Sequence, residues 1–299
     1  MSKSAIKPIL DLMAAMPDMT SVALPELRVL FDSLGQRFPI PPETTIDPLT
    51  ANGVKAEWVC AAGASRERAL LYLHGGGYVM GSPGGYRHLT GALSRAAGAA
   101  VLALDYRLAP EHPFPAAIDD AVSAYRWLLD QGSLPARTVI AGDSGGGGLT
   151  MATLLALRDR ELPMPAAACC NSPWVDLTIT AGSYTSKAAV DPLVSAGMLS
   201  GMAVAYLNGA GAKTPLASPL FADLSGLPPL LIQVGEDEVL LDDSRRLAER
   251  VKEAGGDVTL EVWDGMIHVW HYFYPLLAEG SQAIARIGEF IKSRTAFGG

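Results

Sequence analysis

Cysteine is scarce in this chain of 299 residues, and so is charge. The three cysteines are Cys60, Cys169 and Cys170, an odd number in which two are neighbours along the chain. Such a set predicts neither a disulfide framework nor a cysteine-rich zinc site. Only 18% of the residues are charged, while 49% are hydrophobic. The chain can therefore bury a large core and is not expected to be disordered.

Basic residues are the minority among the charged ones. The 23 lysines and arginines are outnumbered by 31 aspartates and glutamates, which gives a formal net charge of −8. The basic residues also form no cluster along the chain. Because a protein that binds a phosphate backbone needs a basic surface, we expect no nucleic-acid partner.

The sequence also lacks a long apolar run. No uninterrupted stretch reaches the ~18 residues that a membrane-spanning helix needs. Residues 1–20 contain an apolar stretch, but Asp11 interrupts it and no convincing cleavage site follows, so a signal peptide is not expected. These absences predict a cytoplasmic protein without a membrane partner.

From residue 54 onwards, short apolar runs alternate with longer segments that carry apolar residues at helical spacing. This alternation is typical of a mostly parallel sheet with helices on both faces. The predicted strands are 54–59, 69–73, 100–104, 138–141, 166–170, 230–234 and 258–262. The predicted helices are 89–97, 116–130, 147–160, 244–254 and 281–292.

A glycine-rich turn connects one predicted strand to the next predicted helix. Residues 142–146 read Gly-Asp-Ser-Gly-Gly and directly follow the strand at 138–141. This is the context of the G-x-S-x-G nucleophile elbow, in which a strained turn exposes a serine hydroxyl beside a helix N-terminus. A glycine-rich turn whose serine merely caps the helix is the alternative. Ser144 is the candidate nucleophile.

A second glycine cluster lies seventy residues before that serine. His74-Gly75-Gly76-Gly77-Tyr78 follows the strand at 69–73 and matches the HGGG-type loop whose backbone N–H groups bind an oxyanion. Each such donor is worth ~3–4 kcal/mol in the transition state. A phosphate-binding loop is the alternative, but the lysine of a P-loop is missing. The predicted donors are Gly76, Gly77 and Gly145.

Together with two further blocks, these motifs resemble the hormone-sensitive lipase family of α/β-hydrolases, also called bacterial family IV esterases. The matching blocks are HGGGY at 74–78, DYRLAPEHPFPAAIDDA at 105–121, GDSGGG at 142–147 and SPWVDL at 172–177. The resemblance covers residues 50–299. It implies an α/β-hydrolase fold, with a mostly parallel eight-stranded sheet and a helical cap. It also implies hydrolysis of short-chain acyl esters without a metal or organic cofactor.

The catalytic base should come late in the chain, because α/β-hydrolases order their triad as Ser, acid, His. His268 and His271 both qualify by position. His268 lies in WDGMIHVW, just after the strand at 258–262, and resembles the family's G-M-x-H block. A buried structural imidazole is the alternative, and His268 is the predicted base.

The triad acid is the point at which this sequence departs from the family. The family's Asp-Pro-Leu follows a core strand, whereas residues 235–240 here read Gly-Glu-Asp-Glu-Val-Leu. Aligning the leucine places Glu238 on the acid position, and a shift of one residue would select Asp237. Because hydrolase triads use either acid, Glu238 is the prediction and Asp237 the alternative. A literal Asp-Pro-Leu at 191–193 is interpreted as coincidental.

Several other residues near these motifs are expected to have structural roles. Asp143 should point away from Ser144, His74 should brace the oxyanion loop, and Asp242 should cap a helix. His88 is expected at a helix start, and ion pairs or hydrogen bonds are expected to hold the proline-rich block. The residues concerned in that block are Asp105, Arg107, Glu111 and His112.

Two segments, 1–45 and 183–215, do not follow the strand–helix alternation. We predict that they form a helical cap on a catalytic domain made of residues 46–182 and 216–299. Insertions at the carboxyl ends of parallel strands lie above the active site, so the cap should limit substrate size. Met198, Leu199 and Met202 are candidates for the acyl pocket, although apolar residues at helical spacing are more often core.

The predicted function is therefore ester hydrolysis through an acyl-enzyme on Ser144. One alternative is a small-molecule receptor of this fold, whose known examples have lost the triad histidine that His268 supplies here. Another is amide or peptide hydrolysis on the same triad, which the residues do not exclude. We expect no cofactor and no metal. The expected partner is a small ester, and a homodimer is left open.

Overall fold

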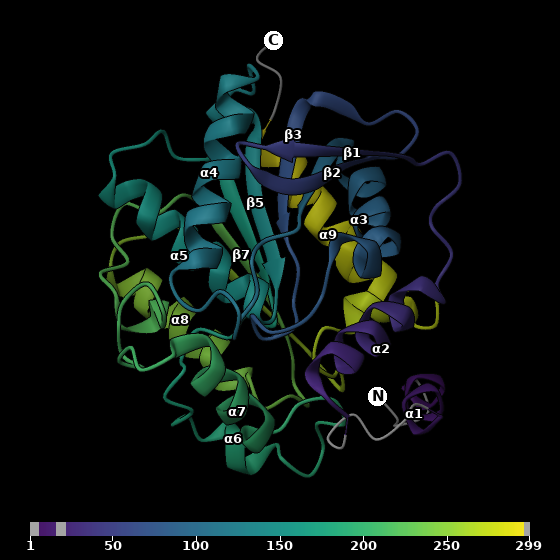
Figure 1. The fold of residues 1–299 in the computed structure, drawn as a ribbon, viewed down its shortest axis with the longest axis vertical. Helices are drawn as coiled ribbons and strands as arrows, with labels where there is room; N and C mark the ends of the chain where they lie inside the picture. The colour runs from purple at the N-terminus through teal and green to yellow at the C-terminus, as the bar shows by residue number, and fades with distance from the viewer. Residues whose placement is uncertain (1–5, 16–21, 296–299) are drawn as a thin grey trace.

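An eight-stranded sheet forms the centre of the computed structural model, which describes residues 6–15 and 22–295 (Figure 1). The strand order is β1-β2-β4-β3-β5-β6-β7-β8. The pairs β1–β2 and β2–β4 are antiparallel, and the other pairs are parallel. The prediction of a mostly parallel, eight-stranded sheet flanked by helices is confirmed.

The inner strands are continuous apolar runs because both of their faces are covered. In β4, which reads AAVLAL, every residue is buried. The strands are β1 (Thr45–Ala51), β2 (Val54–Cys60), β3 (Ser65–Leu73), β4 (Ala99–Leu104), β5 (Thr138–Asp143), β6 (Ala167–Asn171), β7 (Leu230–Gly235) and β8 (Val258–Trp263).

Of the eight strands in the described residues, the sequence patterns miss one, β1. It lies at the edge of the sheet, contains Pro48, and leaves most of its side chains at least partly exposed. An edge strand tolerates proline, since one side of its backbone needs no partner strand. Because few of its side chains are buried, β1 carries no apolar alternation for the sequence to reveal.

Helices cover both faces of the sheet. Helices α4 (Ala116–Asp130), α5 (Gly145–Asp159) and α8 (Leu241–Glu253) pack on one face, and α3 (Pro83–Ala97) and α9 (Ala278–Arg294) on the other (Figure 1). Successive residues of a strand point to opposite faces. In β4, accordingly, Leu102 belongs to the apolar core under α4, α5 and α8, and Val101 belongs to the core under α3 and α9.

The two segments outside the alternation form helices at one end of the molecule, below the sheet in Figure 1. These are α1 (Lys7–Ala14) and α2 (Leu24–Gln36) near the N-terminus, and α6 (Ser183–Ser186) and α7 (Ala196–Leu207) between β6 and β7. Parts of the predicted cap and of the N-terminal stretch, residues 1–5 and 16–21, lie outside the described residues.

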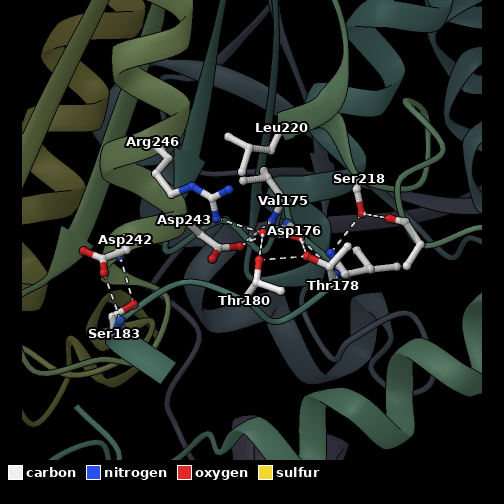
Figure 2. A network of polar contacts seen from close by, with 12 residues as sticks. Val175, Asp176, Thr178, Thr180, Ser183, Ser218, Leu220, Asp242, Asp243 and Arg246 are labelled. Atoms are coloured by element: carbon white, nitrogen blue, oxygen red, sulfur yellow. Dashed lines mark hydrogen bonds and ion pairs between the residues drawn. The ribbon is translucent and has the colours of Figure 1, made fainter. Parts of the chain in front are cut away.

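A polar network joins the loop after β6 to the start of α8 (Figure 2). The Asp243 carboxyl accepts the N–H groups of Val175 and Asp176 at 3.1 and 3.0 Å. Asp176 in turn pairs with Arg246 at 2.8 Å. Burial, followed by the charge of Asp176, raises the pKa of Asp243 to about 8, against the weaker opposing effect of the N–H groups. Asp243 is therefore mostly protonated at neutral pH.

The neighbouring Asp242 does not cap its own helix as expected. It lies in the first turn of α8, but its Oδ2 accepts the N–H of Ser183 at 2.9 Å (Figure 2). This bond ties the segment at residue 183 to α8. A carboxylate at a helix start can accept either a free N–H of its own helix or an N–H of a neighbouring loop. Asp242 accepts the N–H of the neighbouring segment.

The free energy of unfolding of Asp243→Asn, relative to that of the wild type, should increase as the pH rises. The raised pKa of Asp243 means that its contribution to stability is complete below the ordinary value of 3.8 and is lost as the pH rises towards about 8. Within that window the loss is ~1.4 kcal/mol per pH unit. Asparagine does not titrate and keeps an oxygen for both N–H groups. Urea unfolding at pH ~5 and ~7 measures the difference, and a pH-independent difference would contradict a protonated Asp243.

Candidate active site

Ser144 stands on the turn between β5 and α5. Its backbone angles, φ 55° and ψ −122°, lie outside the regions that residues with a side chain ordinarily adopt. Two backbone hydrogen bonds of 2.9 Å hold it there. The Ser144 N–H donates to Asn171 O, and the Trp174 N–H donates to Ser144 O. The strand β6 and the loop after it thus maintain the strained turn.

Glycines allow this turn to be so tight. A Cβ on Gly142 would lie 2.3 Å from the carbonyl oxygen of Gly146. A Cβ on Gly146 would lie 2.0 Å from the carbonyl oxygen of Leu73 at the end of β3. Any side chain at these two positions would force the strands and α5 apart, which is the physical reason for the glycines of the motif.

Ser144, His268 and Glu238 meet although they come from three separate loops. His268 Nε2 lies 3.0 Å from Ser144 Oγ, and His268 Nδ1 lies 2.8 Å from Glu238 Oε2. All three are buried, with exposed fractions of 8%, 6% and 0% for Ser144, His268 and Glu238. A hydroxyl, an imidazole and a carboxylate at these distances have the geometry that nucleophilic catalysis requires. Asp237 instead pairs with Lys187 at 3.4 Å.

The second oxygen of Glu238 is also held. Oε1 accepts hydrogen bonds from the Ser172 hydroxyl at 2.8 Å and from the Gly235 N–H. The Ser172 hydroxyl also accepts the N–H of Val269, the residue after His268, at 3.1 Å. With Oε1 held in this way, Oε2 is directed at His268. The sequence analysis missed Ser172, for which the only available signal was its place in the SPWVDL block.

Glu238 determines the basicity of His268. Burial lowers the pKa of His268, but the hydrogen bond and the charge of Glu238, together with smaller contributions from Asp191 and Asp143, outweigh that effect. The pKa is therefore raised above its ordinary value of 6.5. The charged imidazolium form of His268 is thus favoured in this site.

The glycine loop at 74–78 lies directly against the Ser144 turn. A Cβ on Gly145 would lie 3.1 Å from the backbone N of Gly77. Gly76 and Gly77 have φ angles of 111° and 60°, in the region that favours glycine. Within the described part of the chain, the N–H groups of these two glycines donate to no protein acceptor. They are available to an oxygen atom of a ligand.

Asp143 fastens this loop to the Ser144 turn. Its Oδ1 accepts the Gly75 N–H at 3.0 Å and the Tyr72 hydroxyl at 2.7 Å, and its Oδ2 accepts the Tyr86 hydroxyl at 2.9 Å. The carboxyl thus faces the glycine loop. Burial raises its pKa to about 6, although these hydrogen bonds favour the charged form.

The other polar residues near the motifs have protein partners. His74 stacks on Tyr106 with 4.3 Å between ring centroids, and His88 Nε2 lies 2.9 Å from Tyr272 O. His271, the other histidine considered as base, lies 2.7 Å from the side chain of Gln233. In the proline-rich block, ion pairs of 2.7 Å link Arg107 to Asp120 and Glu111 to Arg28. These contacts fit structural roles.

An apolar cavity lies over Ser144, His268, Gly76 and Gly77. Both segments outside the strand–helix alternation contribute to its wall. The wall residues from these segments are Met13, Phe31, Leu34, Leu193, Val194, Met198, Leu199 and Met202. The three residues suggested for an acyl pocket are among them.

Two further kinds of site are absent from residues 6–15 and 22–295. Histidine, cysteine and carboxylate side chains form no group of three or more there that could hold a metal ion. No helix in this part of the chain combines the length and the apolar character needed to cross a bilayer.

The chain resembles known α/β-hydrolases along nearly its whole length. Residues 70–272 match the family described as the alpha/beta hydrolase fold. An acetyl-hydrolase of Streptomyces hygroscopicus is 50% identical over 277 residues, which are 93% of this chain and 90% of that relative. Two crystal structures each cover 99% of this chain and 100% of their own. One, of an esterase soaked with p-nitrophenyl butyrate, has 51% identity and a TM-score of 0.94. The other, of a bacterial hormone-sensitive lipase family esterase, has 47% identity and a TM-score of 0.95. This chain therefore belongs to the α/β-hydrolase fold family and, within it, to the bacterial hormone-sensitive lipase family of esterases.

Proposed function

We propose that this chain hydrolyses short-chain carboxylic esters by transferring the acyl group to Ser144. The observation that carries the proposal is the continuous hydrogen-bonded series Ser144–His268–Glu238, at 3.0 and 2.8 Å, beside unused backbone N–H groups. The names of the relatives, an acetyl-hydrolase and esterases, support the substrate class.

The first half of the reaction acylates Ser144. Its Oγ attacks the carbonyl carbon of the ester while His268 Nε2 takes the hydroxyl proton. The carbonyl oxygen becomes negative and accepts hydrogen bonds from the N–H groups of Gly76, Gly77 and Gly145. Gly145 is the first residue of α5, so its N–H has no acceptor within the helix. His268 then gives its proton to the departing alcohol.

The second half of the reaction releases the acid. A water molecule attacks the acyl carbon, with His268 again as the base, and the C–O bond to Ser144 breaks as His268 returns a proton to Oγ. Throughout, Glu238 keeps the imidazole in one orientation and stabilises its charged form. The bonds that hold Glu238 Oε1 keep this carboxylate directed at Nδ1.

Residues 1–45 and 183–215 act in this proposal as a cap over the catalytic domain of residues 46–182 and 216–299. The cap contributes the wall along which the acyl chain lies. Met202 lies directly against this glycine loop, because a Cβ on Gly77 would lie 2.2 Å from Met202 Sδ. The thioether is apolar and flexible, which suits contact with acyl chains.

Ser144→Ala should abolish ester hydrolysis because it removes the proposed nucleophile. It should leave the fold intact because, among the described residues, the Ser144 hydroxyl bonds only to His268. The assay is release of p-nitrophenol from p-nitrophenyl acetate, with circular dichroism as the control for folding. Turnover near the wild-type rate in the folded variant would exclude Ser144 as the nucleophile.

Glu238→Gln should lower kcat by ~10⁴, as the corresponding change does in a Ser–His–Asp triad. The acidic limb of the kcat/KM profile should also move to lower pH, because Glu238 no longer raises the pKa of His268. Asp237→Asn is the matched control, since Asp237 pairs with Lys187, and it should change kcat little. A larger loss for Asp237→Asn would assign the acid to Asp237.

Met202→Trp should lower kcat/KM for butyrate and longer esters more than for acetate. The indole ring is larger than the methionine side chain and would narrow the cavity over Ser144. Each methylene group that no longer fits the cavity should change the difference in activation free energy between two esters by ~1–3 kcal/mol. Val204→Trp, on the same helix but 73% exposed, is the control and should keep the wild-type profile. Equal losses for all p-nitrophenyl esters in Met202→Trp would remove Met202 from the acyl pocket.

A further inference from the structure

The Asp-Pro-Leu at 191–193, interpreted from sequence as coincidental, contains a carboxylate with three backbone partners. Asp191 Oδ1 accepts the N–H groups of Leu193 and Val194, each at 3.0 Å. Asp191 Oδ2 accepts the N–H of Val239 at 2.9 Å. The residue is only 9% exposed. Hydrogen bonds from backbone N–H groups to a buried carboxylate are strong and directional, so they hold the segments that they join in a fixed orientation.

The two oxygens of Asp191 contact two different parts of the site. Leu193 and Val194 line the cavity that contains Ser144. Val239 directly follows Glu238, whose carboxylate binds His268. Asp191 thus connects the wall of the cavity to the loop that carries the triad acid. It hydrogen-bonds to neither Ser144 nor His268.

Further contacts join the same two stretches of chain. The Ser183 hydroxyl donates to Val239 O at 2.6 Å, and the Ser183 N–H donates to Asp242 at 2.9 Å (Figure 2). Lys187 pairs with Asp237 at 3.4 Å. The stretch 183–194 therefore lies along residues 237–242. Of these contacts, only those of Asp191 also include residues of the cavity wall.

We propose that Asp191 is a positioning residue for both the chemistry and the acyl selectivity of this site. Its bond to Val239 holds the Glu238 loop in the orientation that directs the carboxylate at His268. Its bonds to Leu193 and Val194 hold the wall at the distance that admits short acyl chains. The inference rests on the proposed ester hydrolysis and adds to it a residue whose Asp-Pro-Leu context was interpreted as coincidental.

Two substitutions of Asp191 separate its two functions. Asp191→Ala removes all three hydrogen bonds. Asp191→Ser keeps a hydroxyl oxygen that can accept the N–H groups two and three residues later, as serine does in turns, but is too short to reach Val239. Lys187→Met is the matched control, because it removes an ion pair between the same two stretches of chain.

The readouts are kcat and KM on p-nitrophenyl acetate and butyrate, together with Tm. Asp191→Ser should lower kcat on both esters by ~10-fold or more, since small displacements of catalytic groups cost up to ~100-fold. Its ratio of kcat/KM between the two esters should stay at the wild-type value. Asp191→Ala should lower kcat likewise and also change that ratio by ~5-fold. Lys187→Met should leave both quantities within ~2-fold of the wild type.

Wild-type kinetics in folded Asp191→Ala and Asp191→Ser would overturn the proposal and leave Asp191 a merely structural residue. So would a Lys187→Met variant with the kinetics of Asp191→Ala, because loosening of the junction would then suffice. A wild-type protein that hydrolyses neither ester would refute the proposed function itself, and this inference with it.

If both Asp191 variants fail to fold, amide hydrogen exchange in the wild-type protein decides the matter. The N–H groups of Val239, Leu193 and Val194 share one carboxylate, so they should be protected to a similar degree and become exposed together. Rapid exchange at Val239 with protection at the other two would show that the connection to the acid loop is absent, and would overturn the proposal.

Discussion

The strained backbone of Ser144 is the constraint on which the rest of this site depends. Its positive φ costs on the order of 1–3 kcal/mol and is maintained by hydrogen bonds to Asn171 and Trp174 and by the close approach of glycines to β3. The same turn fixes the start of α5 and thereby the N–H of Gly145. One backbone conformation thus positions both the hydroxyl and one of the N–H groups proposed to bind the oxyanion.

Around this turn, carboxylates that accept backbone N–H groups hold the loops together. Asp143 binds Gly75 of the oxyanion loop, Glu238 binds Gly235, Asp243 binds the loop after β6, and Asp191 binds Val239. Loops at the end of a sheet have no neighbouring strand to accept their N–H groups, and a buried N–H without an acceptor is costly. The buried carboxylates meet that need and, in doing so, set the geometry of the site.

Most of the fold and the candidate site residues could be predicted from the sequence, because local residue patterns indicate the strands and the glycine-rich turns. Continuous apolar runs marked the inner strands, and glycines marked the elbow and the oxyanion loop. Aligning Leu240 with the leucine of the family's Asp-Pro-Leu block selected Glu238 as the predicted acid, with Asp237 as the alternative. The strand β1 was missed because it is exposed and contains Pro48. The contacts of Ser172 with Glu238 and of Asp191 with Val239 could not be predicted, since each joins residues far apart along the chain.

The proposed reaction requires a covalent bond between Ser144 and the substrate, and a phosphonate ester with a p-nitrophenol leaving group tests this bond most directly. Such a reagent resembles the tetrahedral intermediate and leaves a stable adduct on the nucleophile. Peptide mass spectrometry should find one adduct per chain, on the peptide that contains Ser144, and its formation should parallel the loss of esterase activity. An adduct on another residue that parallels this loss, or full activity in the labelled protein, would contradict the account.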